Sequence, residues 1–134
     1  MLYYEIAAVT HGANRVLQAL AGEPISPPWE NESELIQESV EDGVLTVLEN
    51  PGITAEKIHN NWVDFRKSQG WKWGPVKDLD KKEHPDIGPW TALDINAQRK
   101  SKVFVAIIMA LKETTYDDAR VLRGHRNDFT STRS

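Results

Sequence analysis

The sequence of 134 residues contains no cysteine, which excludes disulfide bonds and thiolate metal sites. It has no apolar run near the roughly 20 residues that span a bilayer, since the longest covers only residues 103–111. The N-terminus shows no basic start followed by an apolar stretch, so we expect no signal peptide. These absences predict a cytoplasmic protein without membrane partners, and its length suits one domain.

An excess of basic residues is also missing. The formal net charge is -4 and the isoelectric point is about 5.5. Proteins that bind DNA carry a basic patch or stripe, so we do not expect DNA as a partner. A small local basic patch would still hold one phosphate-bearing ligand.

The motifs of common enzyme classes are absent as well. No two histidines stand four residues apart, and no Gly-x-Ser-x-Gly or glycine-rich nucleotide loop occurs. The one candidate catalytic cluster is His84 with Asp78 or Asp86, and no obvious nucleophile is near it. We therefore expect no enzyme activity, no catalytic residue, no metal site and no cofactor.

What the sequence does contain is helical periodicity. Apolar residues at steps of three and four predict helices over residues 3–21, 32–48, 55–69 and 94–112. In the first helix the residues that share an apolar face are Ile6, Val9, Ala13, Val16, Leu17 and Leu20. A proline-rich linker, residues 23–30, follows that helix.

Four of the five tryptophans lie between residues 62 and 90. Trp71 and Trp73 alternate with Lys72, so we expect both rings on one side of an extended segment. Residues 76–90 are polar and predict an ordered loop. The fold class is therefore mainly α with minor β. We predict a domain over residues 1–113 and a polar tail over residues 114–134 that serves as an oligomer contact.

The segment after the third helix has a distinctive order of motifs. It reads Gly70-Trp71-Lys72-Trp73-Gly74-Pro75-Val76-Lys77-Asp78, then Lys82-Glu83-His84-Pro85 and Pro89-Trp90. This resembles the RyR domain, the repeat of ryanodine receptors, whose hallmark is Gly-Trp-x-Tyr-Gly-Pro-x-x-Asp followed by a basic residue and His-Pro. Trp73 replaces the family's tyrosine. Ile58-His59-x-x-Trp62 and Ala13-Asn14-Arg15 also fit, and the resemblance covers residues 3–113.

The resemblance implies binding rather than catalysis. Paired repeats in animal channels hold an adenine nucleotide between their two halves, and single domains occur in bacterial and phage genomes. There they look like sensors or sequestering proteins (sponges) for nucleotide-derived signals in anti-phage defence. It therefore implies a nucleotide-like small molecule as ligand and a homodimer as the assembly.

The candidate ligand-binding residues follow from the chemistry of a nucleotide. A purine stacks on an aromatic face, and two copies of Trp71 across a twofold axis would sandwich one base. Lysines neutralise phosphates, and a histidine donates a hydrogen bond. The residues that we assign to the site are Trp71, Trp73, Lys77, Lys82, His84 and Trp90.

Simpler interpretations stay open for the same residues. Trp62 shares a helix face with Ile58 and Phe65, which favours core packing over ligand contact. The lysines would then form a solvated face, and Trp71 or Trp90 would only cover the helices. In this alternative the domain is a protein-interaction or structural module, with buried tryptophans and no polar-lined pocket.

Overall fold

The computed structural model describes residues 1–112, which form four long helices, two short strands and two 3-10 turns. Each long helix begins and ends within two residues of its predicted bounds, which confirms a mainly helical fold. The C-terminal tail, residues 114–134, which we predicted to be an oligomer contact, lies outside the described residues. The elements in chain order are α1 (Tyr3–Leu20), η1 (Trp29–Asn31), α2 (Glu34–Glu49), α3 (Ala55–Ser68), β1 (Lys72–Trp73), β2 (Glu83–His84), η2 (Trp90–Ala92) and α4 (Ile95–Leu111).

Side-chain caps fix where three of the helices begin. Ser33 accepts a hydrogen bond from the N–H of Ile36, and Thr54 and Asp94 do the same for α3 and α4. After α3 the chain turns at Gly70, whose φ of +90° is a conformation that favours glycine. These local signals explain why the sequence predicts the helix bounds well.

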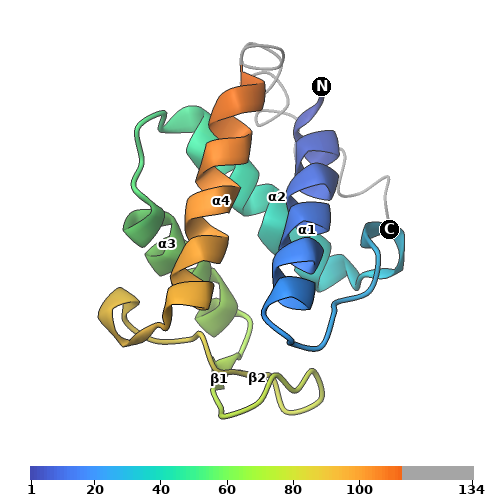
Figure 1. Ribbon diagram of the computed structural model, residues 1–134, viewed down its shortest axis with the longest axis vertical. Coiled ribbons are helices and arrows are strands. Elements are labelled where there is room, and N and C mark those ends of the chain that lie inside the picture. The colour runs from blue at the N-terminus through green and yellow to red at the C-terminus, as the bar shows by residue number, and fades with distance from the viewer. Residues whose placement is uncertain (113–134) are drawn as a thin grey trace.

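The helices pack around one central core. Figure 1 shows α4 in front, between α1 and α3, with α2 crossing behind, and each of α1, α3 and α4 contacts α2. The largest fully buried side chains in this core are Ile6, Leu45, Leu48 and Ile108. Within residues 1–112, no helix combines the length and the apolar character that crossing a bilayer requires.

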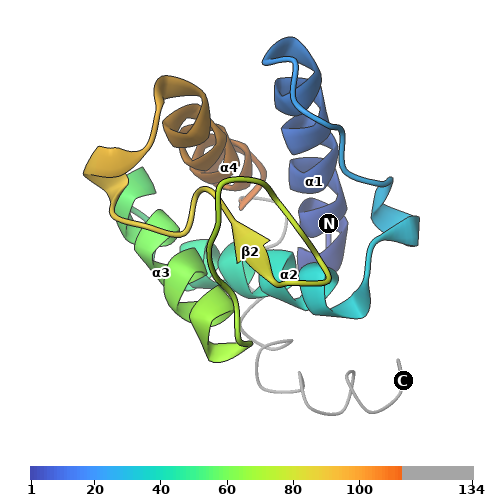
Figure 2. The same ribbon diagram turned by 90° about the horizontal axis from the view of Figure 1, so that it is seen from below.

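The lower end of the molecule is closed by the segment between α3 and α4. β1 and β2 pair in parallel, with Lys72 opposite Glu83 and Trp73 opposite His84. Seen from below, β2 and its loop lie across the space between α1 and α3 (Figure 2). The predicted loop at residues 76–90 thus contains β2, which supplies the hydrogen-bonded partner that β1 needs, and it ends where η2 begins.

Helix α1 faces the core only in part as we predicted: Ile6 of the predicted apolar face is fully buried, but other residues of that face are not. Val9, Val16 and Leu20, expected on its packed apolar face, are 42%, 58% and 80% exposed. The buried side of α1 instead includes the polar residues Thr10, His11 and Gln18. Turning a polar helix face inward requires hydrogen-bonding partners there, and the linker supplies them.

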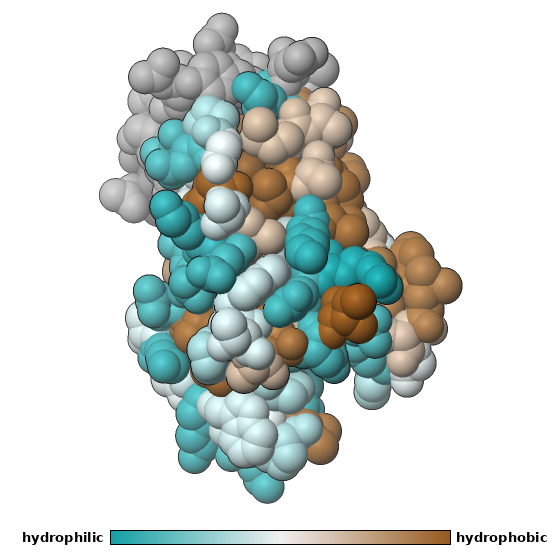
Figure 3. Space-filling model, turned by 60° about the vertical axis from the view of Figure 1, so that its left-hand side comes forward, coloured by the Kyte–Doolittle hydropathy of each residue, from teal (hydrophilic) through white to brown (hydrophobic). Residues whose placement is uncertain are grey.

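Helix α4 is also less buried than its apolar pattern predicts. Ile108 is fully buried, but Val103, Phe104, Ile107 and Leu111 are only partly so. Figure 3 shows apolar side chains collected over α4 in the upper part of that face, while hydrophilic ones prevail below. The polar lower part is where the loop residues lie.

Candidate ligand pocket

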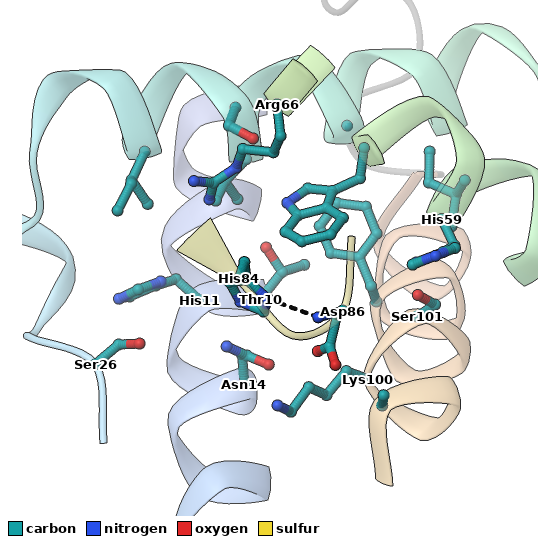
Figure 4. Close-up of a pocket in the computed structure, with 18 of the residues that line it drawn as sticks. Thr10, His11, Asn14, Ser26, His59, Arg66, His84, Asp86, Lys100 and Ser101 are labelled. Carbon is teal, nitrogen blue, oxygen red and sulfur yellow. Dashed lines mark hydrogen bonds between the residues drawn. The ribbon is translucent and has the colours of Figure 1, made fainter. Parts of the chain in front are cut away.

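A cavity of about 190 Å³ lies between the helices and the closing segment. Side chains from all four long helices line it, together with Ser26 and Glu32 of the linker and Lys77, His84 and Asp86 of the loop. Figure 4 shows how these groups converge from separate elements. The cavity is smaller than the roughly 300–1,000 Å³ of pockets that enclose drug-sized ligands, so it suits a small ligand or one end of a larger one.

Arg66 is the most unusual group in this pocket. It stands in the last turn of α3 and is only 5% exposed, yet its Nε and Nη1 atoms have no hydrogen-bond partner among residues 1–112. The guanidinium carbon lies 5.3 Å from the ring centre of Trp62 and 4.8 Å from that of Trp71. Two cation–π contacts therefore hold a buried cation whose donors are unused.

Burial lowers the pKa of Arg66 to about 10, although the nearby Glu32 carboxylate favours the charged form. Glu32 is itself buried, and its Oε2 lies 3.4 Å from His11 Nε2. No carboxylate in the described part of the chain lies within ion-pair distance of Arg66. Arg66 thus remains a charged group without a direct counter-ion.

Two lysines add positive charge to the same space. Lys77 is exposed as a residue, but its Nζ lies 3.4 Å from the buried Ser26 Oγ, and burial of this ammonium lowers the pKa of Lys77. Lys100 of α4 lines the cavity and forms a 2.6 Å ion pair with Glu23 of the linker. Lys77 therefore brings a second cation without an ion-pair partner in the described residues.

His84 of β2 lines the pocket, and its low pKa leaves it uncharged at neutral pH. Burial, reinforced by the positive charges of Lys77 and Arg66, lowers the pKa of His84 to about 3. Its Nδ1 accepts a 3.0 Å hydrogen bond from the backbone N–H of Asp86, drawn as the dashed line in Figure 4. Burial in turn raises the pKa of the Asp86 carboxyl.

The aromatic wall of the pocket comes from α3. Trp62 contacts two imidazole rings, with ring centres 5.9 Å from His59 and 5.1 Å from His84. The Nε2 of His59 donates a 2.8 Å hydrogen bond to the carbonyl oxygen of Gly88, which anchors the ring to the closing segment. Trp62 and both histidines line the cavity.

Two of the six predicted site residues, Lys77 and His84, line this cavity. Trp71 is only 4% exposed and packs with Val63 and Ile87 in a second apolar cluster. This burial argues against a base sandwiched between two copies of Trp71. Trp73 is 60% exposed and is not among the residues that line the cavity.

The remaining two predicted residues also lie away from the cavity lining. Lys82 adopts a positive φ of 54°, and its Nζ donates a 2.8 Å hydrogen bond to the carbonyl oxygen of Gln69. Trp90 begins η2, and its ring centre lies 5.9 Å from that of His59. Lys82 therefore has a structural contact, and Trp90 supports the pocket wall from behind.

Several pocket residues escaped the sequence analysis. The sequence analysis did not single out Arg66, and we expected Trp62 to be core. The signal was their spacing: residues four apart on a helix are neighbours, which places Arg66 beside Trp62. His59 and Lys100 had no comparable signal, because their partners are distant in sequence.

The acidic groups of the pocket do not form a metal centre. Among residues 1–112, no three histidine, aspartate or glutamate side chains gather closely enough to hold a metal ion. Asp78, considered above as a catalytic partner of His84, instead accepts hydrogen bonds from the backbone N–H groups of Asp80 and Lys81. Its carboxylate shapes the loop rather than lining the cavity.

Comparison with known protein families supports the motif resemblance. The family model of the RyR domain matches residues 46–115, more than half of the chain. The match runs from α2 through the whole closing segment to the end of α4. No solved structure matches the chain. The chain belongs to the RyR domain family.

Proposed function

We propose that this RyR domain binds a small phosphate-bearing ligand, an adenine nucleotide or a signalling molecule derived from one, and does not alter it chemically. The observation that carries the proposal is Arg66, a buried cation with two unused donors that lines a cavity. A buried donor without a partner costs about 1–3 kcal/mol, and more for a charged group. A phosphate in the cavity would remove that cost.

The surrounding charges fit a phosphate group. Burial, and to a smaller extent the positive charge of Arg66, lowers the pKa of Lys77, and an anion bound between the two cations would relieve their repulsion. Arginine offers directed donors and lysine a mobile point charge, a combination that phosphate sites use. Trp62 supplies an aromatic surface beside them.

The size of the cavity limits which nucleotides enter it. A volume of about 190 Å³ holds part of a mononucleotide and leaves the rest at the surface. The site is built within a single chain, so binding does not require the homodimer that the family resemblance implies. Sensing and sequestering remain equally compatible with it.

Binding without reaction is the simpler expectation for these residues. A general base works best when its pKa is near the working pH, and burial has lowered the pKa of His84 to about 3. The Asp86 carboxyl does not orient His84 as a catalytic partner would, because the contact is made by its backbone N–H. We therefore propose no catalytic residue.

Calorimetry with a panel of nucleotides tests the proposal. The panel contains AMP, ADP, ATP, cyclic mononucleotides, cyclic dinucleotides and ADP-ribose, titrated into the wild type, Arg66→Met and Arg99→Met. We expect saturable binding of at least one mononucleotide to the wild type. The control variant Arg99→Met should bind equally well, because Arg99 is exposed and does not line the cavity. Arg66→Met should not bind. If no phosphate compound binds the folded wild type, the proposal is wrong.

A protein-interaction role is the second candidate, and one observation favours it. Beyond Glu5, every exposed residue of α1 is uncharged, among them Val9, Val16 and Leu20. Exposed apolar helix faces of this kind often mark contacts between proteins. Sedimentation of the wild type and Val16→Glu tests this: a dimer that dissociates in the variant supports α1 as a homodimer contact, and a wild-type monomer contradicts it.

A further inference from the structure

The side chain of Asp86 is another polar group of the cavity without a partner. Its backbone N–H donates to His84, but no hydrogen bond or ion pair within residues 1–112 uses its carboxylate oxygens. The residue lines the cavity, and burial is the main cause of the raised pKa of its carboxyl. A partly buried carboxylate without a donor is unfavourable, so a ligand that supplies a donor would be stabilised there.

Asp86 lies at a different end of the cavity from the two cations that we assign to the phosphate. After burial, which raises the pKa of Asp86, the largest effect on it is that of the Lys100 charge, which lowers it. The charge of Asp86 is not among those that shift the pKa of Arg66 or Lys77. Figure 4 agrees, since the Asp86 carboxylate lies beside Lys100 and well apart from the Arg66 guanidinium. A ligand with its phosphate at Arg66 would therefore meet Asp86 with the part of the molecule that follows the phosphate.

Lys100 supplies hydrogen-bond donors at the end of the cavity where Asp86 lies. Its ammonium has three N–H groups, and the 2.6 Å contact with Glu23 uses one of them. Asn14 and Ser101 also line the cavity, and neither side chain makes a hydrogen bond in the part of the chain that the structure describes. The lining therefore holds unused donors and unused acceptors besides the two cations.

This combination favours hydroxyl groups. A carboxylate can only accept and an ammonium can only donate, so a ligand group between Asp86 and Lys100 has to do both. A hydroxyl does both. An ammonium group on the ligand would be repelled by Lys100, and a second anion would be repelled by Asp86.

We infer that the cavity takes a phosphorylated sugar, whose hydroxyl groups donate to Asp86 and accept from Lys100. This inference rests on the proposed function, in which Arg66 and Lys77 hold the phosphate, and it names the part of the ligand that enters the protein. A sugar carries several hydroxyls within a short distance of its phosphate. A cavity of about 190 Å³ is too small for a drug-sized ligand, so the base of a nucleotide would stay outside it.

Ribose 5-phosphate and tetrahydrofurfuryl phosphate test the inference, because both carry a five-membered ring and a phosphate but only the first has hydroxyls on the ring. Calorimetry measures the Kd of each ligand for the wild type, Asp86→Ala and the control Asp80→Ala. Asp86→Ala keeps the backbone N–H that His84 uses, and Asp80 is exposed and outside the cavity lining. Circular dichroism and urea denaturation establish that the variants fold, and the comparison of the two ligands in the wild type needs no variant.

We expect the wild type and Asp80→Ala to bind ribose 5-phosphate at least about tenfold more tightly than the analogue, which is what a hydrogen bond to a charged group contributes. In Asp86→Ala this preference should fall to about twofold or less. The analogue itself should bind Asp86→Ala at least as tightly as the wild type, because the variant removes a negative charge from a cavity that holds an anion. A purely structural role of Asp86 would weaken both ligands alike.

The outcomes separate this inference from the proposed function. If the wild type binds both ligands equally, or if its preference persists in folded Asp86→Ala, the sugar assignment is wrong and phosphate binding through Arg66 stands. If nucleotides bind but ribose 5-phosphate does not, the inference also fails. If no phosphate compound binds the folded wild type, both proposals are overturned.

Discussion

Replacing Arg66 by methionine should remove ligand binding while leaving the stability of the free protein nearly unchanged. Burial lowers the pKa of Arg66 from its ordinary value of 12.5 to about 10. At about 1.4 kcal/mol for each pKa unit, this disfavours the charged form in the fold by roughly 3 kcal/mol. Methionine is unbranched and apolar, so it fills much of the same space without that cost.

The favourable contacts of Arg66 offset most of this cost. Each desolvated cation–π contact, to Trp62 at 5.3 Å and to Trp71 at 4.8 Å, contributes about 1–2 kcal/mol. Their sum is close to the desolvation cost, so Arg66→Met should change the free energy of unfolding by less than about 1 kcal/mol. An ion-paired buried arginine behaves differently, since its removal costs about 3–5 kcal/mol.

Urea denaturation with and without AMP measures both effects. At a ligand concentration 100 times its Kd, the wild type should gain about 2.7 kcal/mol of stability, and Arg66→Met should gain none. Arg99→Met, in which an exposed arginine is replaced, should behave as the wild type. A loss above about 3 kcal/mol without ligand would show that Arg66 serves the fold, and an undiminished gain with AMP would place the ligand elsewhere.

Three further perturbations follow from the same contacts. Because burial lowers the pKa of His84 from 6.5 to about 3, the unfolded chain takes up the proton first. The free energy of unfolding should therefore fall below pH 6.5 by at most about 1.4 kcal/mol per pH unit. Equilibrium denaturation at several pH values should measure a shallower slope for His84→Asn than for the wild type. Gly74→Ala would place a Cβ 2.5 Å from a β2 side chain and should cost about 1–3 kcal/mol, whereas Gly88→Ala, which meets nothing within 4 Å, should be nearly neutral in thermal melts. Lys77→Met should weaken AMP binding about tenfold and reduce its salt dependence in calorimetry, while Lys81→Met, outside the cavity lining, should not.

The helices could be predicted from the sequence because their signals are local. Thr54 and Asp94 cap the helices that they precede, and Gly70 ends α3 with a positive φ. Such signals depend on a few adjacent residues, so they act in the folded protein as the sequence predicts. The parallel pairing of β1 with β2 had no local signal, because its partners are eleven positions apart in the sequence and meet only through the loop.

The orientation of α1 could not be predicted from periodicity. An apolar stripe normally faces the core, as Ile6 and Ala7 do here, yet polar residues of the later turns of α1 also face inward because the linker supplies hydrogen bonds. The Nε2 of His11 donates to the carbonyl oxygen of Pro27 at 2.8 Å, and Gln18 exchanges two hydrogen bonds with Ser26. These partners are 8 and 16 residues away, beyond what a helical repeat can reveal.

The same limit explains which site residues were found. Lys77 and His84 belong to motifs of the closing segment, which the family resemblance identifies, and both line the cavity. His59 also belongs to a motif of the resemblance, but neither it nor Arg66 was assigned to the site, because only helix packing brings them to that segment. Trp71, the aromatic residue of the strongest motif, lies under Arg66 and supports the site instead of lining it.

The inward polar face of α1 bears on the choice between a binding domain and a structural module. A scaffold gains most by burying apolar side chains, at about 25 cal/mol per Å². This chain instead exposes Val16 and Leu20 and lines an interior cavity with His11 and Gln18. Departures from the pattern that would maximise stability tend to occur at functional sites. The inward polar residues of α1 and the unpaired donors of Arg66 therefore support the proposed ligand-binding function over a purely structural role.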